Sequence, residues 1–185
     1  MFANSFCKKT KAFLWLVALW LTTSFAQAQP IWQSRLPTDL RVVGSGEMTW
    51  FGFSIYQARL WSKQYPFNPS QPYALELTYA RNISKSEFVE ASMDEMSRIS
   101  GVSAKSSQMQ QWQGWMEKAF IDVKPGDQLI GVHWPGVGCA FYSQSQLLSE
   151  IKDPEFAKNF FAIWLDPQSK DRRLREQLLG KRTSM

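Results

Sequence analysis

The hydrophobic pattern is most informative between residues 121 and 142, where two extended apolar runs are separated by turns. A turn is predicted at residues 124–127 (Lys-Pro-Gly-Asp), because proline fixes φ and the glycine after it accepts the positive φ of a type II turn. Residues 129–134 then form a predicted strand, and residues 137–142 return after a Pro-Gly turn. Apolar side chains occur on both faces of the first strand, which is typical of the middle of a sheet. We therefore expect the rest of the chain to pack against this hairpin.

Strand patterns also precede this hairpin. A β signal begins at Leu40, is interrupted by Gly-Ser-Gly at residues 44–46, and resumes at Glu47. We expect the chain to turn near residues 50–52 and to continue as a strand over residues 53–60.

Bulky apolar or aromatic side chains alternate with small or polar ones over residues 73–80, a pattern typical of a strand. One face of this predicted strand carries the bulky side chains of Tyr73, Leu75, Leu77 and Tyr79. Arg81 has the parity of the same face and lies at its end. A further short strand is predicted over residues 147–151.

Helical periodicity occupies two stretches between these strands. Residues 84–87 (Ser-Lys-Ser-Glu) predict a capping box, and Gly101 supplies the stop. The apolar stripe of this first helix is expected at Phe88, Ala91, Ser92, Met96 and Ile99. A second helix begins near Ser107, with a stripe at Met109, Trp112, Met116, Ala119 and Phe120.

Two more helices are predicted near the C-terminus. Asp-Pro-Glu at residues 153–155 combines an N-cap, a proline at the first helical position and an acid in the first turn. Residues 156–165 are apolar on nearly all sides, which indicates a helix inside a core. Asp-Pro at residues 166–167 ends it, and a last amphipathic helix ends at Gly180.

The N-terminus has the three parts of a secretory signal peptide. Three lysines precede an apolar run over residues 12–21, followed by Ala-Gln-Ala at residues 26–28. We expect cleavage after Ala28 and export to the periplasm or beyond. An uncleaved membrane anchor is the alternative, although the run is shorter than the roughly 20 residues that span a bilayer. The predicted organisation is signal peptide 1–28, leader 29–39 and a single domain over 40–185.

The mature chain lacks the residue sets of the common catalytic centres. Removal of the three signal lysines lowers the formal charge from +5 to +2, so nothing demands an acidic partner. Cys139 is its one cysteine and His133 its one histidine. Both are expected to be buried, with His133 hydrogen-bonded, which excludes the usual zinc ligand sets and disfavours a Ser-His-Asp centre. The Gly-Ser-Gly at residues 44–46 lacks the third glycine of a dinucleotide fingerprint. We therefore predict no metal, no cofactor and no catalytic residue.

Two compositional features leave alternatives open. Basic side chains with interleaved acids at residues 171–182 indicate a solvated helix face, with nucleic-acid or lipid contact as the alternative. We expect no nucleic-acid partner and no stable membrane span. Nine tryptophans and thirteen phenylalanines predict either a bulky core or an apolar ligand cavity with few polar groups at its mouth.

Three segments in this order resemble the chalcone isomerase-like family, in particular its secreted bacterial branch. They are Phe-Ser-Ile-Tyr-Gln-Ala-Arg-Leu at residues 53–60, Val-Lys-Pro-Gly-Asp-Gln-Leu at 123–129, and the apolar helix over 153–165. The resemblance covers residues 43–180. It implies an α+β open-faced β-sandwich, in which a large antiparallel sheet carries helices on one face and a ligand cleft between the two layers.

The resemblance also implies which chemistry to expect. True chalcone isomerases close a flavanone ring, plant relatives without that activity bind fatty acids, and the bacterial branch is regarded as non-catalytic. The catalytic threonine of the enzymes matches Ser54. Their catalytic arginine matches the strand that holds Glu47, and we expect that acid to repel a developing oxyanion. The helix around residues 109–115 lacks their tyrosine and asparagine.

The leading hypothesis is therefore an exported binding protein for a small apolar or fatty-acid-like ligand. The candidate ligand-binding residues are Ser54, Tyr56, Tyr79, Arg81 and Trp112. Arg81 is expected at the cleft mouth, where a guanidinium suits a carboxylate head group; the alternative is that it pairs with Glu87. Two other hypotheses stay open: an isomerase or intramolecular lyase for an unsaturated carbonyl compound, and an interaction protein whose cleft is closed by packed aromatic residues.

Overall fold

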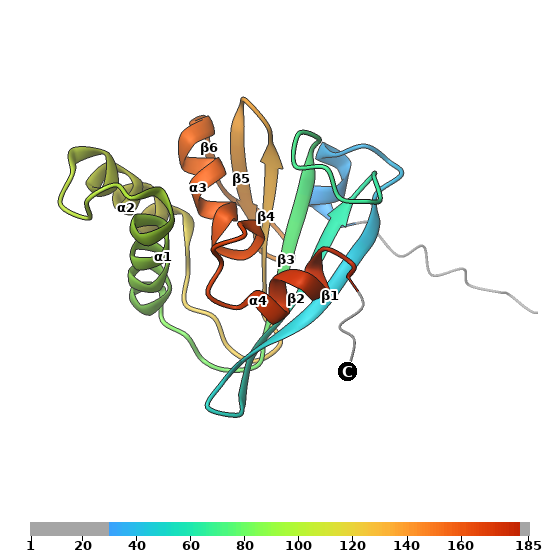
Figure 1. Cartoon of the computed structure of the whole chain (residues 1–185), viewed down its shortest axis with the longest axis horizontal. Helices are drawn as coiled ribbons and strands as arrows, with labels where there is room; N and C mark the ends of the chain where they lie inside the picture. Colours follow the sequence, from blue (N-terminus) through green and yellow to red (C-terminus); the bar gives the residue numbers. More distant parts are fainter. Residues whose placement is uncertain (1–29, 182–185) are drawn as a thin grey trace, which may run out of the picture.

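The computed structural model describes residues 30–181, which form one antiparallel sheet with helices on one face (Figure 1). The six strands follow the order of the chain, and each pairs with the next. They are β1 (Arg41–Trp50), β2 (Phe53–Ser62), β3 (Tyr73–Tyr79), β4 (Gln128–Trp134), β5 (Gly138–Tyr142) and β6 (Leu147–Ile151). The predicted α+β fold, with a large antiparallel sheet under a layer of helices, is confirmed. The predicted signal peptide lies outside the described residues.

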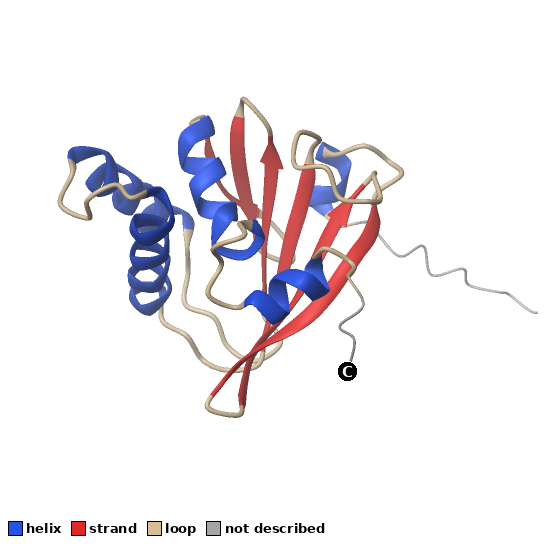
Figure 2. Cartoon of the chain, in the orientation of Figure 1, coloured by secondary structure: helices blue, strands red, loops and turns tan. Residues whose placement is uncertain are grey.

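The four α-helices form the second layer. They are α1 (Lys85–Ser100), α2 (Ser107–Ala119), α3 (Pro154–Leu165) and α4 (Arg172–Leu178), and a 3-10 helix, η1 (Ile31–Arg35), precedes the first strand. Helix α3 packs on β4 and β5, and α4 packs on β1 and β2 (Figure 2). Helix α1 packs on α3 and α2, while α2 reaches the sheet at β6. The pair α1 and α2 therefore extends the layer beyond α3.

Local signals explain where the helices begin and end. The Ser84 hydroxyl accepts a hydrogen bond from the Glu87 amide at 3.2 Å, and the Glu87 carboxylate accepts one from the Ser84 amide at 2.8 Å. Gly101 ends α1 with φ 71°. These caps confirm the predicted boundaries. The stripe of α1 is rotated from the expected one, because the buried side chains are Val89, Ser92, Met93 and Met96.

The sheet is covered on both faces where β4 and β5 lie. The helix-side core contains Leu129, Cys139 and Phe141, while a smaller cluster on the opposite face contains Ile130, Val132, Ala140 and Tyr142. Trp32 and Leu36 cover that opposite face. The segment predicted as a leader therefore includes η1, which packs on the sheet because its tryptophan supplies a large apolar surface.

Gly44 and Gly46 mark a close approach between distant parts of the chain. Strand β1 runs through both glycines without the predicted break, although its register with β2 shifts between Val42 and Gly44. A Cβ at Gly44 would collide with the carbonyl oxygens of Gln177 and Leu178, and one at Gly46 would lie 2.8 Å from Leu174 Cδ1. Glycine is therefore required at Gly44, where the clash is with the backbone of α4, and Gly46 makes room for side chains of the same helix.

Candidate functional site

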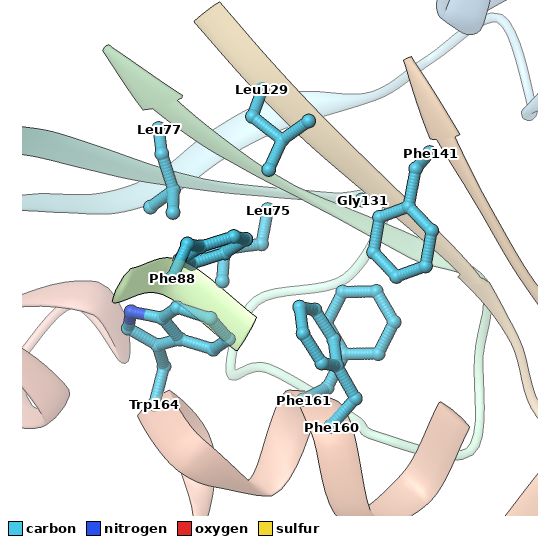
Figure 3. A pocket seen from close by; sticks show the side chains of 9 residues that line it. All are labelled: Leu75, Leu77, Phe88, Leu129, Gly131, Phe141, Phe160, Phe161 and Trp164. Carbon is cyan, nitrogen blue, oxygen red and sulfur yellow. The ribbon is translucent and has the colours of Figure 1, made fainter. Parts of the chain in front are cut away.

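The space between the sheet and α3 is apolar and almost completely filled. Its lining comes from the sheet, from α3 and from one residue of α1 (Figure 3). The lining residues are Leu75, Leu77, Phe88, Leu129, Gly131, Phe141, Phe160, Phe161 and Trp164. The cavity left among them is about 10 Å³. Such a volume holds at most about one water molecule, whereas small-molecule pockets measure about 300–1,000 Å³.

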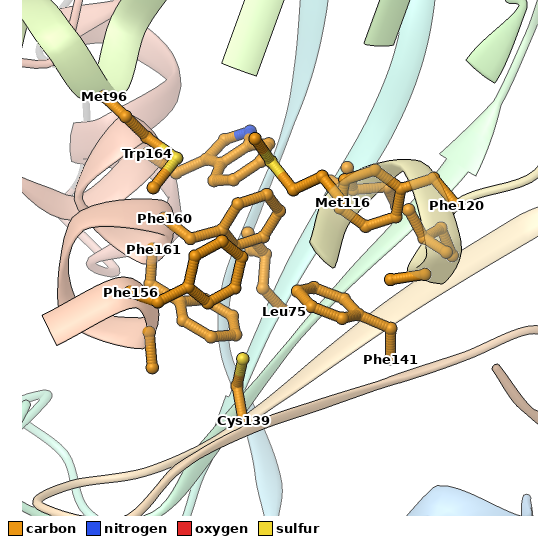
Figure 4. Packing of buried hydrophobic residues seen from close by; sticks show 14 of the residues in the cluster. Leu75, Met96, Met116, Phe120, Cys139, Phe141, Phe156, Phe160, Phe161 and Trp164 are labelled. Atoms are coloured by element: carbon orange, nitrogen blue, oxygen red, sulfur yellow. The ribbon is translucent and has the colours of Figure 1, made fainter. Parts of the chain in front are cut away.

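Aromatic rings of α3 fill this space. The Phe160 ring lies 5.0 Å from Phe141 and 5.4 Å from Trp164, both nearly edge to face (Figure 4). Phe161 occupies the place that a side chain at Gly131 would take, since a Cβ there would lie 2.9 Å from the Phe161 ring. The cleft implied by the resemblance is therefore closed in this structure by rings that stand over a glycine in the sheet.

One end of the space carries polar groups. Tyr56 and Tyr79 are paired across β2 and β3, with ring centroids 5.9 Å apart. The Trp164 indole donates a hydrogen bond to the Tyr56 hydroxyl at 3.0 Å. Burial raises the pKa of Tyr56 to about 12 and also raises the pKa of Tyr79. Both phenols are therefore neutral at pH 7 and act as hydrogen-bond donors or acceptors rather than as charges.

The remaining predicted site residues lie in different surroundings. Ser54 is half-buried on β2, two residues before Tyr56. Arg81 is exposed and lies over the Phe53 ring, 5.4 Å from its centroid. Trp112 is 1% exposed in α2 and contacts Phe156, so it belongs to the core between α2 and α3 and does not line the cavity.

The expected alternative partner of Arg81 is engaged elsewhere. The Glu87 carboxylate accepts hydrogen bonds from the Ser84 amide and hydroxyl, at 2.8 and 2.7 Å. Among residues 30–181, no acidic side chain forms an ion pair with Arg81. The guanidinium therefore lies exposed over the Phe53 ring, without an acidic partner among the described residues.

The orientation of β1 corrects one expectation about the catalytic residues. Met48 is paired with Tyr56, so Met48 faces the helices and the preceding residue, Glu47, faces away from the cleft. The predicted repulsion between Glu47 and an oxyanion is therefore wrong. The position that does face the helices holds a methionine, which supplies no charge to stabilise an oxyanion.

The opposite end of the space contains His133. Its ring lies 4.8 Å from Tyr73 and 5.2 Å from Phe161. The predicted burial is correct, but the expected hydrogen bond is missing at Nδ1, which has no partner among the described residues. Burial lowers the pKa of His133 from 6.5 to about 4. The ring is therefore neutral at pH 7 and packs as an aromatic group.

We expect acid to destabilise the fold through His133. Its folded pKa lies below its unfolded value, so the unfolded state binds the proton first and stability falls as the pH drops from about 6.5 toward 4. Between pH 7 and pH 5 the loss amounts to about 2 kcal/mol from this residue. Urea unfolding of wild type and His133→Phe at both pH values measures it. Equal losses in the two proteins would contradict the assignment, because the phenylalanine does not titrate.

These observations define an open-faced β-sandwich with a closed apolar space under its helices. The chain matches the model of the chalcone isomerase-like family over residues 35–180, and it belongs to that family. The resemblance noted in the sequence is thereby confirmed. Among residues 30–181, no helix is long and apolar enough to cross a bilayer.

Known proteins that the chain is similar to have low sequence identity to it. An uncharacterized protein of Haemophilus influenzae is 28% identical over 181 residues, which cover 96% of this chain and 80% of that protein. Among solved structures, a fatty-acid binding protein of Arabidopsis thaliana superposes with a TM-score of 0.60 and 11% identity. The match covers 78% of this chain and 89% of the plant protein, and it shows a shared fold.

Sequence reasoning missed most residues that line the apolar space. Phe160, Phe161 and Trp164 belong to the stretch predicted as a core helix, and Phe88 to the predicted stripe of α1. The signal that distinguishes them is the indole of Trp164, because a buried indole needs a hydrogen-bond partner and therefore points to a polar group nearby. Tyr56 is that group.

Proposed function

We propose that this protein is an exported, non-catalytic binding protein for an apolar ligand with a carboxylate head, such as a fatty acid. The observation that supports it best is the wholly apolar lining between sheet and α3, which ends at the neutral phenols Tyr56 and Tyr79. The fold match to a protein described as fatty-acid binding agrees with this ligand class. The proposal includes no catalytic step, since no charged side chain lines the space.

Binding requires the space to open, because about 10 Å³ cannot hold a hydrocarbon chain. Phe88 is half-buried at its edge, where its ring lies 4.5 Å from Phe120 and 6.4 Å from Tyr79. Helix α1 packs mainly on α2 and α3, and Phe88 joins it to the lining of the space. An outward movement of α1 with Phe88 would therefore expose the apolar lining without breaking any strand pairing.

In this arrangement Arg81 receives the carboxylate. It stands two residues after β3, beyond Tyr79, and its guanidinium has no acidic partner among the described residues. Guanidinium and carboxylate form paired, charge-assisted hydrogen bonds. The hydrocarbon tail would then replace ring contacts between α3 and the sheet.

Calorimetric titration with decanoate tests the head-group assignment. A charge-assisted hydrogen bond is worth about 1.5–3 kcal/mol, so Arg81→Leu should bind at least about tenfold more weakly than wild type. Arg173→Leu, which alters an exposed arginine of α4, is the matched control and should bind as wild type does. Unchanged affinity in Arg81→Leu would remove this residue from the site, and no binding by wild type would remove the proposed function.

Export is tested separately. We expect the mature protein to begin at Gln29, because the Ala-Gln-Ala at residues 26–28 is a typical cleavage site. N-terminal sequencing of protein recovered from the periplasm or the medium measures this. An exported protein that still begins with Met1 would contradict the predicted cleavage.

A further inference from the structure

The turn between β1 and β2 exposes three aromatic side chains. Trp50, Phe51 and Phe53 are 62%, 83% and 64% exposed, and only Gly52 interrupts them. We call residues 50–53 the hairpin tip. In Figure 1 this hairpin extends past the other strands at the lower end of the sheet. Its side chains therefore add nothing to the core and stand clear of the body of the protein.

The backbone conformation of the turn is unfavourable for the phenylalanine at position 51. Phe51 has φ 47° and Gly52 has φ 79°, so both central residues of the turn are left-handed. Such a two-residue turn favours Asn-Gly, because the left-handed region costs a residue with a large side chain about 1–2 kcal/mol. Phe51 is exposed, so no burial of its ring offsets the cost of the left-handed conformation. The Phe51 ring lies 5.0 Å from the ring of Trp50, but both rings remain exposed. Neither turn chemistry nor core packing accounts for a phenylalanine here, which indicates a contact outside the folded chain.

The shape and chemistry of the tip indicate what that contact is. A stable protein interface buries about 800 Å² on each partner, which a tip of three side chains does not supply. Tryptophan concentrates in the headgroup region of a bilayer, and exposed phenylalanines of surface-binding elements insert at the same depth, so the tip suits a bilayer surface. Arg81 lies over the Phe53 ring at 5.4 Å, and a cation here is attracted by anionic headgroups. The nearest acid along β1, Glu47, lies three strand pairs back from the turn.

We propose that the hairpin tip docks the protein on the surface of a lipid bilayer that contains anionic lipid, with Trp50, Phe51 and Phe53 entering the headgroup region. The tip continues directly into Ser54 and Tyr56 on β2, so docking would place the polar end of the apolar space toward the membrane. The inference depends on the tip itself and does not require a fatty acid to be the ligand.

Co-sedimentation with vesicles of phosphatidylcholine and phosphatidylglycerol tests the docking. We expect wild type to bind and Phe51→Asn to bind about tenfold more weakly, since the loss of one inserted phenylalanine removes a large apolar contact. This substitution creates the Asn-Gly pair that the turn prefers, so it should keep or raise stability. Val137→Asn is the matched control: Val137 is 60% exposed in the β4–β5 turn, at the opposite end of the sheet, and its variant should bind as wild type does.

Three results would overturn the inference. They are no vesicle binding by wild type, equal binding by Phe51→Asn, or a tip-dependent dimer in sedimentation velocity without vesicle binding. The emission of Trp50 provides a second measurement, because its blue shift on vesicles should be absent from Trp50→Phe. Decanoate affinity in solution should be the same for Phe51→Asn and wild type, so failure of docking and failure of the proposed ligand function are separate outcomes.

Discussion

Gly44→Val is expected to lower the free energy of unfolding by about 3 kcal/mol or more, which is at the upper end for an overpacked site. A Cβ at this position would meet the carbonyl oxygens of Gln177 and Leu178 and would lie 2.7 Å from the Leu178 carbonyl carbon. These atoms belong to the backbone of α4 and its C-terminal end, so no side-chain rotation relieves the clash. The helix must lift from β1, and the buried contacts of Leu174 and Leu178 are weakened.

Urea unfolding followed by far-UV circular dichroism measures this effect. Gly114→Ala is the matched control, because Gly114 lies inside α2 and a Cβ there meets nothing within 4 Å. Alanine should stabilise that helix by about 0.5–1 kcal/mol. An unchanged free energy of unfolding in Gly44→Val would show that α4 does not approach β1 as closely as described.

Phe161→Ala is expected to cost about 3–5 kcal/mol, since it removes a fully buried ring. Phe161 lies against Gly131, which has no side chain to expand into the space that the ring leaves. The variant should therefore contain a real cavity between α3 and the sheet. Under the proposed function that cavity is part of the ligand space, so added decanoate should recover stability in a concentration-dependent way.

Phe156→Ala provides the comparison. Phe156 is equally buried in α3 but does not line the apolar space, and its ring contacts Trp112 and Trp115. Its loss should destabilise the fold by a similar amount without any decanoate-dependent recovery. Thermal unfolding of both variants with increasing decanoate distinguishes them, and an equal response would exclude the space beside Gly131 as the ligand site.

The parts of the site that local pattern predicted are those within one strand or one pair of strands. Alternation placed Tyr79 with the bulky face of β3, and the structure then paired it with Tyr56 because β2 and β3 are neighbours in the sheet. The contact of Tyr56 with Trp164 was not predictable, because it joins residues 108 positions apart and depends on where α3 crosses the sheet. Trp112 has the same helical periodicity as a cleft residue, yet α2 directs it toward Phe156.

Register explains the errors on the first strand. Glu47 lies in the strand that matches the catalytic arginine of the enzymes. Which face of the sheet a strand side chain points to depends, however, on how that strand pairs with its neighbour. Pairing of Met48 with Tyr56 sends Glu47 to the opposite face, and a register shift follows between Met48 and Thr49. Irregular pairing of this kind depends on both strands together, so the pattern of one strand does not reveal it.

The sequence by itself determined the α-helices and most strands, because a capping box, N-cap residues, positive-φ glycines and alternating strands act over a few residues; the continuity of β1 and the helix η1 were not predicted. It also determined that β4 and β5 are buried on both faces, since their apolar residues leave no polar face. Only the tertiary structure decided that Gly44 and Gly46 are contact points for α4, that η1 covers the second face, and that aromatic rings close the apolar space. Each of these depends on the distance between elements far apart in the chain, which packing of the whole domain sets.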